Sequence, residues 1–379
     1  MLILVINCGS SSVKYQLFDI TGQDYNRSLA PLAKGLIERI GRASSCRDHY
    51  AAINIIVEKL IDRRHGVISS KSEIKGIGHR VVHGGEEFKH STLITKKVID
   101  SIEKYSEIAP LHNPPSLSGI RGCAKILKGI PQAAVFDTSF HQTMKPEAFL
   151  YGLSFKYYKK YGIRKYGFHG TSHRYVAEKT ARKLGRSLNS LKIITCHLGN
   201  GCSMAAVDRG ISVDTSMGFT PLEGLLMGTR SGDMDPAVIL YLLKKERMSL
   251  ERMGDILNKE SGLLGISGVS NDMRDLVKTV GRRPKTRDRK SARARLAIEM
   301  FVYRIKKYIG AYQAAMAGLD AVVFTGGIGE NHPWLVRRIE NDLKNVVARR
   351  TKFLVIPTNE ELLIAKDTYN VVRRNDAKS

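Results

Sequence analysis

The sequence has little of what marks membrane, disulfide-rich or zinc-binding proteins. No apolar run reaches the roughly 18 residues that a membrane helix needs. The N-terminal MLILVI segment leads into a Gly/Ser turn without a basic start or a small-residue cleavage site, so we expect a strand and not a signal peptide. The 5 cysteines among 379 residues form no C-x-x-C pair. Their scatter argues against a disulfide framework or a zinc site and favours a reducing, cytoplasmic location.

Acidic residues are also scarce. The chain has 36 Asp and Glu against 61 Lys and Arg, a net charge of +25, which favours anionic partners such as nucleic acid or phosphorylated small molecules. The densest basic stretch is 281–295, GRRPKTRDRKSARAR, where Asp288 is the only acidic residue. No aromatic side chains interleave with these charges, as base stacking would require. A solvated loop leading into a helix is therefore a simpler interpretation than a nucleic-acid-binding arm.

Two segments half a chain apart share one pattern. Residues 2–22 (LILVINCGSSSVKYQLFDITG) and 193–210 (IITCHLGNGCSMAAVDRG) each run from an apolar strand through a small polar turn into a second strand. Each pattern predicts a β-hairpin. A third apolar strand leads into the double-glycine turn of AVVFTGGIGEN, residues 321–331. Helical periodicity occurs at residues 54–62, 97–108, 173–184 and 292–317. Alternating strands and helices predict an α/β fold built from two similar halves.

The glycine-rich tips of these hairpins are candidates for phosphate binding. Such turns expose backbone N–H groups in a concave arrangement that suits phosphate oxygens. The first tip, NCGSSS at 7–12, adds hydroxyl groups, and Lys14 adds a positive charge. The second tip, LGNG at 198–201, offers the same backbone geometry, and simple turns are the alternative interpretation. Neither tip has the spacing of a P-loop or of the dinucleotide-binding fingerprint.

Histidines and arginines gather near glycines and prolines, away from helix faces. They occur in GHRVVHGG (78–85), PLHNPP (110–115), YGFHGTSH (166–173) and MGTRSGDMDP (227–236). A guanidinium group matches carboxylate and phosphate geometry, although a structural salt bridge is the alternative. Asp137 ends an apolar strand, where α/β folds place reacting groups, and an N-cap is its alternative.

Two further oxygen donors stand at predicted element ends. Asn7 ends the first strand, and Glu360 begins the last predicted helix in PTNEEL. Such side chains can hold Mg²⁺ directly or through its waters.

Taken together, these segments resemble the signatures of the acetate kinase family. VINCGSSSVKYQLFD is similar to the first family signature and YGFHGTSHRYV to the second. The blocks APLHNPP, FDTSFHQTM, HLGNG, GFTPLEGLLMGTRSGDMDP, GLLGISGVSNDMRDL, FTGGIGEN and PTNEEL follow in the family's order, from residue 3 to about 366. The resemblance implies a duplicated, two-domain actin-like ATPase (ribonuclease H-like) fold with a nucleotide cleft between the domains. We expect one domain at 1–143 plus 364–379, with the C-terminal helix packing back, and the other at 144–363.

The resemblance also implies a reaction. It is the reversible, Mg²⁺-dependent transfer of the ATP γ-phosphoryl group to acetate, giving acetyl phosphate and ADP, with Mn²⁺ as a substitute metal. It further implies a cytoplasmic homodimer with neither a membrane nor a nucleic-acid partner. Acetate is ionised at neutral pH, because its pKa is near that of Glu, about 4.3. The reaction therefore needs electrostatic stabilisation and positioning more than a general base.

The resemblance assigns roles motif by motif. Arg80 and Arg230 would bind the carboxylate and the moving phosphoryl group, and His169 would stabilise the transition state. Asp137 would be the catalytic acidic residue, which we expect to orient arginines or Mg²⁺-bound water. The implied substrate contacts are Val82, Leu111, His112, Phe168 and Pro221, and the implied metal ligands are Asn7 and Glu360. The implied ATP contacts are Ser10, Ser12, Lys14, His197, Leu198, Gly199, Asn200, Gly201, Asp272, Met273, Arg274, Gly327, Ile328, Gly329, Glu330 and Asn331.

The chain departs from the family pattern without altering these positions. It is shorter between 331 and 358, has Gly326 where the family often has Ala, and is strongly basic. A propionate or butyrate kinase on the same scaffold stays an alternative, since one methylene is worth only about 1–3 kcal/mol of discrimination. Val82 at the pocket base favours a short acyl chain. A non-catalytic, basic ATP-binding assembly protein or nucleic-acid-binding protein is the alternative from another class.

Overall fold

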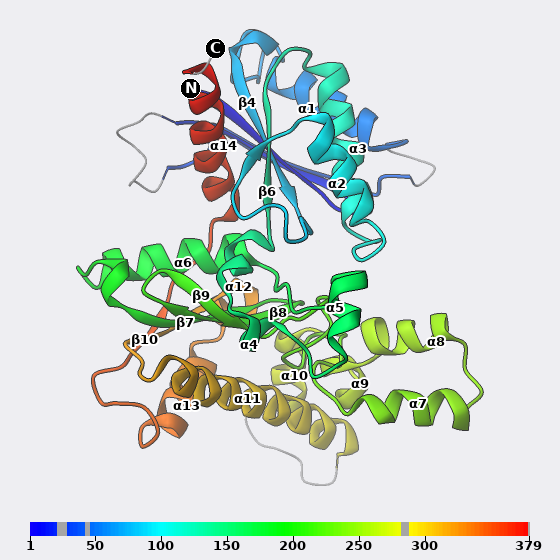
Figure 1. The fold of residues 1–379 in the computed structure, drawn as a ribbon, viewed down its shortest axis with the longest axis vertical. Coiled ribbons are helices and arrows are strands. Elements are labelled where there is room, and N and C mark those ends of the chain that lie inside the picture. Colours follow the sequence, from blue (N-terminus) through cyan, green and yellow to red (C-terminus); the bar gives the residue numbers. More distant parts are fainter. Residues whose placement is uncertain (21–28, 42–45, 282–287, 378–379) are drawn as a thin grey trace. The chain divides into compact units, whose positions relative to one another are not determined.

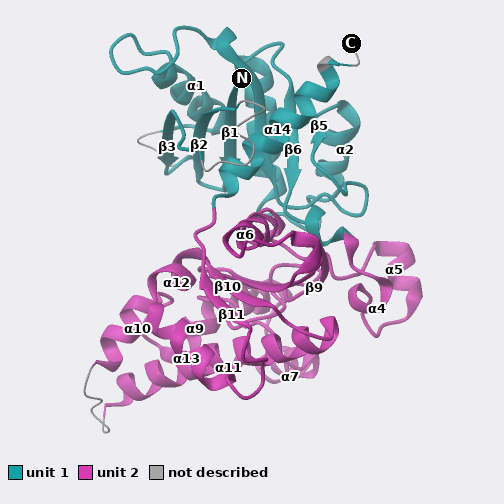
Figure 2. Ribbon diagram, turned by 90° about the vertical axis from the view of Figure 1, so that its left-hand side faces the viewer, with its two compact units in different colours: residues 1–142, 359–379 teal, residues 143–358 magenta. Residues whose placement is uncertain are grey.

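The chain divides into two compact units. The computed structural model describes residues 1–20, 29–41, 46–281 and 288–377. Unit 1 comprises residues 1–142 and 359–379, and unit 2 comprises residues 143–358 (Figure 2). The first sequence-based boundary differs from this division by one residue. The second differs by five, because the last helix already begins at Glu360. Part of the basic stretch at 281–295, residues 282–287, lies outside the described residues.

Unit 1 is built on a six-stranded sheet with the order β3-β2-β1-β4-β6-β5. Its central strand β1 is almost entirely apolar, as expected for a strand flanked on both sides and covered on both faces. The strands are β1 (Leu2–Cys8), β2 (Ser12–Asp19), β3 (Ala33–Glu38), β4 (Ile74–Val81), β5 (Thr92–Leu93) and β6 (Gln132–Phe136). The helices are α1 (His49–Leu60), α2 (Lys96–Lys104), α3 (Asn113–Ile126) and α14 (Glu360–Asp376).

Helices cover both faces of this sheet (Figure 1). Alternate residues of β1 point in opposite directions. Leu4 and Ile6 join the core formed with α1 and α3, whereas Ile3 lies on the face that α14 covers. A Cβ added at Gly78 of β4 would lie 2.3 Å from Thr368 Oγ1. This glycine therefore lets α14 approach the sheet closely and fixes where Glu360, at its first turn, is placed.

Unit 2 repeats the same strand topology. Its sheet has the order β11-β10-β7-β8-β9. In both units the first three strands are antiparallel neighbours, and the first strand then pairs in parallel with the fourth. That fourth strand pairs in parallel with β6 in unit 1 and with β11 in unit 2, whereas the short β5 of unit 1, which is antiparallel to β6, has no counterpart among the described strands of unit 2. This correspondence confirms the predicted duplication and both predicted hairpins. The strands are β7 (Lys192–Leu198), β8 (Cys202–Asp208), β9 (Ile211–Thr215), β10 (Ala321–Thr325) and β11 (Lys352–Val355).

The helices of unit 2 include two that pack on opposite sides of its sheet, α6 and α11 (Figures 1 and 2). The predicted turn of TGGIGEN is a short helix, α12, because its glycines follow β10 directly and wind instead of reversing the chain. The helices are α4 (Pro146–Phe149), α5 (Phe155–Tyr161), α6 (Gly170–Lys183), α7 (Pro236–Lys245), α8 (Leu250–Asp255), α9 (Gly262–Ser267), α10 (Met273–Val280), α11 (Arg289–Met316), α12 (Gly326–Asn331) and α13 (Pro333–Leu343).

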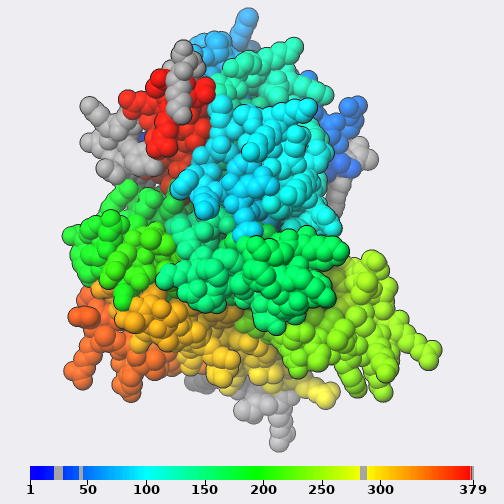
Figure 3. Space-filling view, viewed as in Figure 1, coloured from blue at the N-terminus to red at the C-terminus, as the bar shows by residue number. Residues whose placement is uncertain are grey.

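Helices α7 and α8 lie at the surface of unit 2, in yellow-green in the space-filling view (Figure 3). Although α7 is rich in aliphatic residues, none of them is buried. Leu240 is 69% exposed and Tyr241 is 63% exposed. Within the described part of the chain, no helix is both long enough and apolar enough to cross a membrane.

Candidate active site

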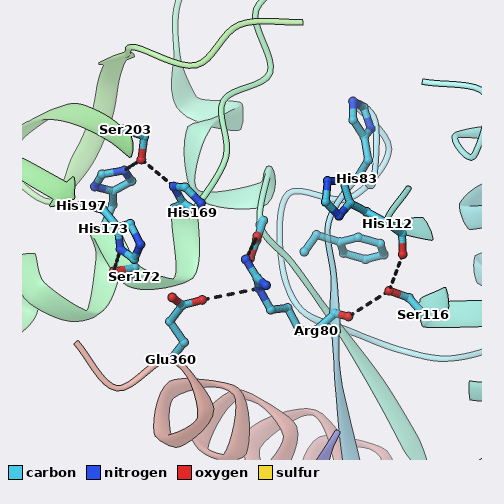
Figure 4. A network of polar contacts seen from close by, with 12 residues as sticks. Arg80, His83, His112, Ser116, His169, Ser172, His173, His197, Ser203 and Glu360 are labelled. Carbon is cyan, nitrogen blue, oxygen red and sulfur yellow. Dashed lines mark hydrogen bonds and ion pairs between the residues drawn. The ribbon is translucent and has the colours of Figure 1, made fainter. Parts of the chain in front are cut away.

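In unit 1, Arg80 lies between two carboxylates, the buried one of Asp137 and the partly buried one of Glu360. Its Nε and Nη2 donate to the two carboxylate oxygens of Asp137, at 3.2 and 2.6 Å. Asp137 directly follows β6, the strand that pairs with β4, and its N–H donates to the Val81 carbonyl at 2.9 Å. Glu360 Oε2 lies 3.5 Å from Arg80 Nε (Figure 4). The fold therefore brings together three residues that the sequence placed in separate motifs. Arg80 itself is on a strand and not in a loop.

The carboxyl groups around Arg80 carry more negative charge than this one cation balances. Burial raises the pKa of Asp137, the Arg80 charge opposes this, and the Glu360 charge raises it further. Burial also raises the pKa of Glu360, against the charge of Arg80. Burial acts to lower the pKa of Arg80, but the two carboxylates outweigh it and raise that pKa above its ordinary value. Two carboxylates that share one cation form a setting suited to a second cation.

The first hairpin lies against the head of α14. Asn7 and Lys14 are opposite each other in the β1–β2 register, and Lys14 Nζ lies 2.5 Å from Glu361 Oε1. Ser10 is exposed at the hairpin tip and Ser12 begins β2. Lys14, predicted as a phosphate contact, is thus paired with a carboxylate in this structure. Its charge also opposes the rise that burial causes in the pKa of the neighbouring carboxyl, Glu360.

The expected substrate contacts of unit 1 differ in exposure. Val82 follows β4 and is partly buried, and His112 is the partly buried N-cap residue of α3. Leu111, expected in an apolar pocket, is 64% exposed. Unit 1 by itself therefore does not enclose this side chain.

The first turn of α3 holds the chain that leaves β4. Asn113 is fully buried, its Oδ1 accepts the His83 N–H at 3.1 Å, and its Nδ2 donates to the His83 and Ile102 carbonyls at 3.0 and 3.1 Å. Ser116 Oγ donates to the Arg80 carbonyl at 3.3 Å (Figure 4). Neither Asn113 nor Ser116 is among the residues predicted from the sequence. A buried amide before two prolines at a helix start is the signal that could have indicated them.

In unit 2, three histidines lie around the Ser203 hydroxyl. Two of them contact this hydroxyl, and the third stacks on one of these two. His169 Nδ1 lies 2.8 Å from Ser203 Oγ, and His173 Nε2 lies 2.7 Å from the same oxygen (Figure 4). His173 Nδ1 lies 2.7 Å from Thr195 Oγ1. The rings of His169 and His197 stack with their centroids 4.4 Å apart. His173 is fully buried on α6, so the expectation that these histidines avoid helix faces is wrong for this residue.

Arg230 borders the glycine turn of the second hairpin. Its Nη1 donates to the Pro221 carbonyl at 3.3 Å. A Cβ added at Gly201 would lie 3.3 Å from Arg230 Nη1 and 3.7 Å from His169 Cε1. Arg230 makes no ion pair with any residue that the structure describes, and burial lowers its pKa. Phe168, which precedes His169, is buried. An incompletely paired guanidinium beside a histidine and an open glycine turn is suited to binding an anion.

A cavity of about 530 Å³ opens beside the same turn. Its lining comes from the β7–β8 turn, the start of α10 and helix α12. Asn271 Nδ2 donates to Asn200 Oδ1 at 3.1 Å across this lining. The lining residues are Gly199, Asn200, Asn271, Asp272, Met273, Arg274, Gly327, Ile328, Asn331 and His332. All except Asn271 and His332 were predicted as ATP contacts. These two immediately adjoin predicted positions, which is the only sequence signal that pointed to them.

Comparison with known proteins shows the family of the chain. Residues 2–348 match the model of the acetokinase family. The chain belongs to the acetokinase family. It is 50% identical to the acetate kinase of Halothermothrix orenii over 409 aligned positions, which cover 98% of this chain and 100% of that protein. It is 49% identical to the acetate kinase of Carboxydothermus hydrogenoformans, with 98% and 99% covered.

Solved structures of this family have the same fold. The crystal structure of Porphyromonas gingivalis acetate kinase is 39% identical with a TM-score of 0.90, covering 98% of this chain and 99% of that chain. That of a propionate kinase from Francisella tularensis is also 39% identical, with a TM-score of 0.87 and the same coverage. The chain therefore has the duplicated, two-domain actin-like α/β fold, as expected from the family signatures.

Several of the predicted ATP contacts have partners within unit 2. Glu330 Oε1 accepts the N–H groups of Gly326 and Thr358 at 2.8 and 3.3 Å. His197 Nδ1 lies 2.8 Å from Ser172 Oγ. Leu198 is fully buried. Asp272 caps α10 by accepting the Arg274 N–H at 2.8 Å, and Gly329 is buried within α12. Of these residues, Asp272 lines the cavity, to which Gly199 and Gly327 present backbone.

Proposed function

We propose that this chain is an acetate kinase, which transfers the γ-phosphoryl group of ATP to acetate and runs the reaction in reverse with acetyl phosphate and ADP. The observation that carries the proposal is Arg230, a partly buried guanidinium with no ion pair among the described residues, beside His169 and the open Gly201 turn. A site of this kind favours a dispersed negative charge, such as that of a phosphoryl group in transfer.

The nucleotide is proposed to bind in the 530 Å³ cavity of unit 2. Gly199 and Gly327 leave room for phosphate oxygens to approach the backbone, since a Cβ at Gly327 would meet nothing within 4 Å. The predicted nucleotide residues that line this cavity come from three separate sequence blocks. Their convergence on one cavity supports the assignment.

Magnesium is proposed to bind near Asn7 and Glu360. The described residues contain no group of three or more His, Cys, Asp or Glu that could hold a metal alone. This suits Mg²⁺, which usually takes one or two protein oxygens together with waters and phosphates. The raised pKa values of Glu360 and Asp137 support the fit, because a nearby dication would favour both charged forms. Bound Mg²⁺ would neutralise phosphate charge, and Mn²⁺, with similar preferences, is proposed to substitute.

The protein side chains act by binding and orientation. Acetate arrives ionised, so no side chain must remove a proton from it. Arg80 is proposed to bind the acetate carboxylate or the transferring group, with its direction set by the bidentate contact to Asp137. Asp137 is therefore a positioning residue and not a base. His169 and Arg230 are proposed to donate to phosphoryl oxygens, where their charge is worth most in the transition state.

A propionate kinase is the second candidate within the same chemistry. The propionate kinase of Francisella tularensis is as identical to this chain as the Porphyromonas acetate kinase is, and Leu111 is largely exposed. One assay separates the candidates: ATP- and Mg²⁺-dependent acyl phosphate formation from formate, acetate, propionate and butyrate, trapped as hydroxamates. The proposal predicts the highest kcat/KM for acetate. A maximum at propionate or butyrate would reassign the acyl preference.

The chain is also proposed to be a homodimer in the cytoplasm. The apolar face of α7, with Leu240 and Tyr241 largely exposed, is a surface that a second copy could cover. The five free cysteine thiols, all buried, suit a reducing compartment. Light scattering after size exclusion should give twice the chain mass, and Leu240→Asp should give monomers. A wild-type monomer at micromolar concentration would contradict the dimer.

A further inference from the structure

The hydrogen bonds around Ser203 determine which nitrogen of His169 carries the proton. A serine hydroxyl has one proton to donate, and Ser203 Oγ lies between two imidazole nitrogens, at 2.8 Å from His169 Nδ1 and 2.7 Å from His173 Nε2. If Ser203 donates to one ring, the other ring must donate to Ser203 to keep its bond. The tautomers of His169 and His173 are therefore coupled.

The far end of the relay sets its direction. Thr195 Oγ1 donates to the Ala205 carbonyl at 3.5 Å, so it accepts from His173 Nδ1 at 2.7 Å. A neutral His173 with its proton on Nδ1 has an acceptor at Nε2, which takes the proton of the Ser203 hydroxyl. Ser203 then accepts from His169, whose proton must be on Nδ1. Thr195, His173 and Ser203 are all fully buried, so water does not compete easily for these bonds.

We propose that Thr195, His173 and Ser203 form a hydrogen-bonded relay that holds neutral His169 as the Nδ1–H tautomer. This inference rests on the proposed function in assigning His169 to the phosphoryl group. In that tautomer Nε2 carries a lone pair, so His169 can donate through Nε2 only after gaining a second proton. The relay thereby makes its contact with an anionic oxygen a charged one, which is stronger than a neutral hydrogen bond.

His169 lies beside the Gly201 turn, where the anion is proposed to bind. His169 Nε2 lies 3.9 Å from the position that a Cβ at Gly201 would take, and Arg230 Nη1 lies 3.3 Å from the same position. The titratable groups near the ring include Arg230, His197, which stacks on it, and His173, which lies across Ser203. Thr195, His173 and Ser203 are thus positioning residues, which act on substrate through His169.

Thr195→Val tests the relay without touching His169. The change removes the acceptor of His173 Nδ1, so His173 should move its proton to Nε2 and donate to Ser203, which should then donate to His169 Nδ1. Nitrogen-15 spectra of histidine-labelled full-length protein, which report the protonated nitrogen of each ring, should show His169 protonated at Nδ1 in the wild type and at Nε2 in the variant. The rate constant kcat should fall roughly tenfold, as for other changes behind a site ligand, with KM for ATP little changed.

Thr180→Val is the matched control. Thr180 is a fully buried threonine on α6 whose hydroxyl donates to the Val176 carbonyl of its own helix, at 2.6 Å, so this variant should change neither the His169 spectrum nor kcat. Wild-type His169 protonated at Nε2, or a tautomer unchanged in Thr195→Val, would overturn the relay. The wild-type spectrum alone decides the tautomer if Thr195→Val fails to fold. A correct tautomer without carboxylate-dependent turnover would uphold the relay and refute the proposed function.

Discussion

The two units repeat one sheet but place their arginines in opposite electrostatic settings. In unit 1, Arg80 makes a bidentate ion pair with buried Asp137 and lies 3.5 Å from the partly buried Glu360 carboxylate. In unit 2, Arg230 has a backbone carbonyl and no ion pair within the described residues. The same scaffold thus holds one guanidinium that is paired with carboxylates of the protein and one that can still pair with a ligand. The difference predicts separate consequences for folding and for catalysis.

The largest effect is expected from Arg80→Ala. Removal of Arg80 leaves the buried Asp137 and the partly buried Glu360 without this cation. The loss should lower the free energy of unfolding by up to about 3–5 kcal/mol and abolish activity. Urea unfolding and the hydroxamate assay measure the two losses. The double variant Arg80→Met/Asp137→Asn should regain stability without regaining activity. Full stability in Arg80→Ala would show that the buried pair contributes nothing to the fold.

Arg230→Ala should separate activity from folding. Because no described carboxylate forms an ion pair with Arg230, its removal should change the free energy of unfolding by less than about 1 kcal/mol. The rate constant for phosphoryl transfer should fall by about 10²–10³, as for other lost transition-state donors. Arg230→Lys keeps the charge without the planar fork, so its rate constant should lie between those of the wild type and Arg230→Ala. A loss of stability as large as that of Arg80→Ala would contradict the proposed difference between Arg230 and Arg80.

Glu330→Ala should have a smaller effect on activity, confined to nucleotide binding. Glu330 Oε1 accepts from Gly326, Thr358 and the Thr325 hydroxyl, so its loss should cost about 1–3 kcal/mol of stability. KM for ATP should rise while kcat changes little. Glu330→Gln keeps one oxygen acceptor and should behave more like the wild type. A large fall in kcat at saturating ATP would instead indicate contact with the reacting group.

The smallest effects should be on the pH dependence of stability, which should have opposite signs for the acidic groups of the two units. Burial raises the pKa of Asp137 above 3.8 and that of Glu360 above 4.5, so the folded state binds protons more readily than the unfolded chain. Their contribution to stability should therefore increase as the pH falls toward these ordinary values. Hydrogen bonds from Arg274 lower the pKa of Asp272 to about 2. Its small contribution, that of an exposed pair, is present above pH 3.8 and is lost as the pH falls toward 2.

Urea unfolding between about pH 2 and pH 7 measures these slopes. Asp137→Asn should remove stabilisation that the wild type gains on acidification, and Asp272→Asn should make the protein slightly less sensitive to acid. Slopes of the same sign for both variants would contradict the assigned environments.

Sequence patterns predicted strands and hairpins better than they predicted which side chains contact one another. The hairpins at Asn7 and Asn200, and Asp137 at a strand end, follow from apolar runs that stop at small polar residues, which is local information. The buried role of Asn113 and the relay through Ser203 depend on contacts between residues far apart in the chain, which periodicity does not contain. TGGIGEN was predicted as a turn because its glycines are turn formers, although here they begin a helix. The pairing of Lys14 with Glu361 was missed for the same reason as the relay.

Hydroxamate formation by folded wild type and Arg230→Ala, with ATP, Mg²⁺ and acetate, tests the central claim most directly. The account predicts acetate-dependent turnover in the wild type and a loss of at least about 100-fold in Arg230→Ala, with both proteins equally stable to urea. Turnover unchanged by the substitution, or wild-type protein that folds and binds ATP but phosphorylates no carboxylate, would contradict it.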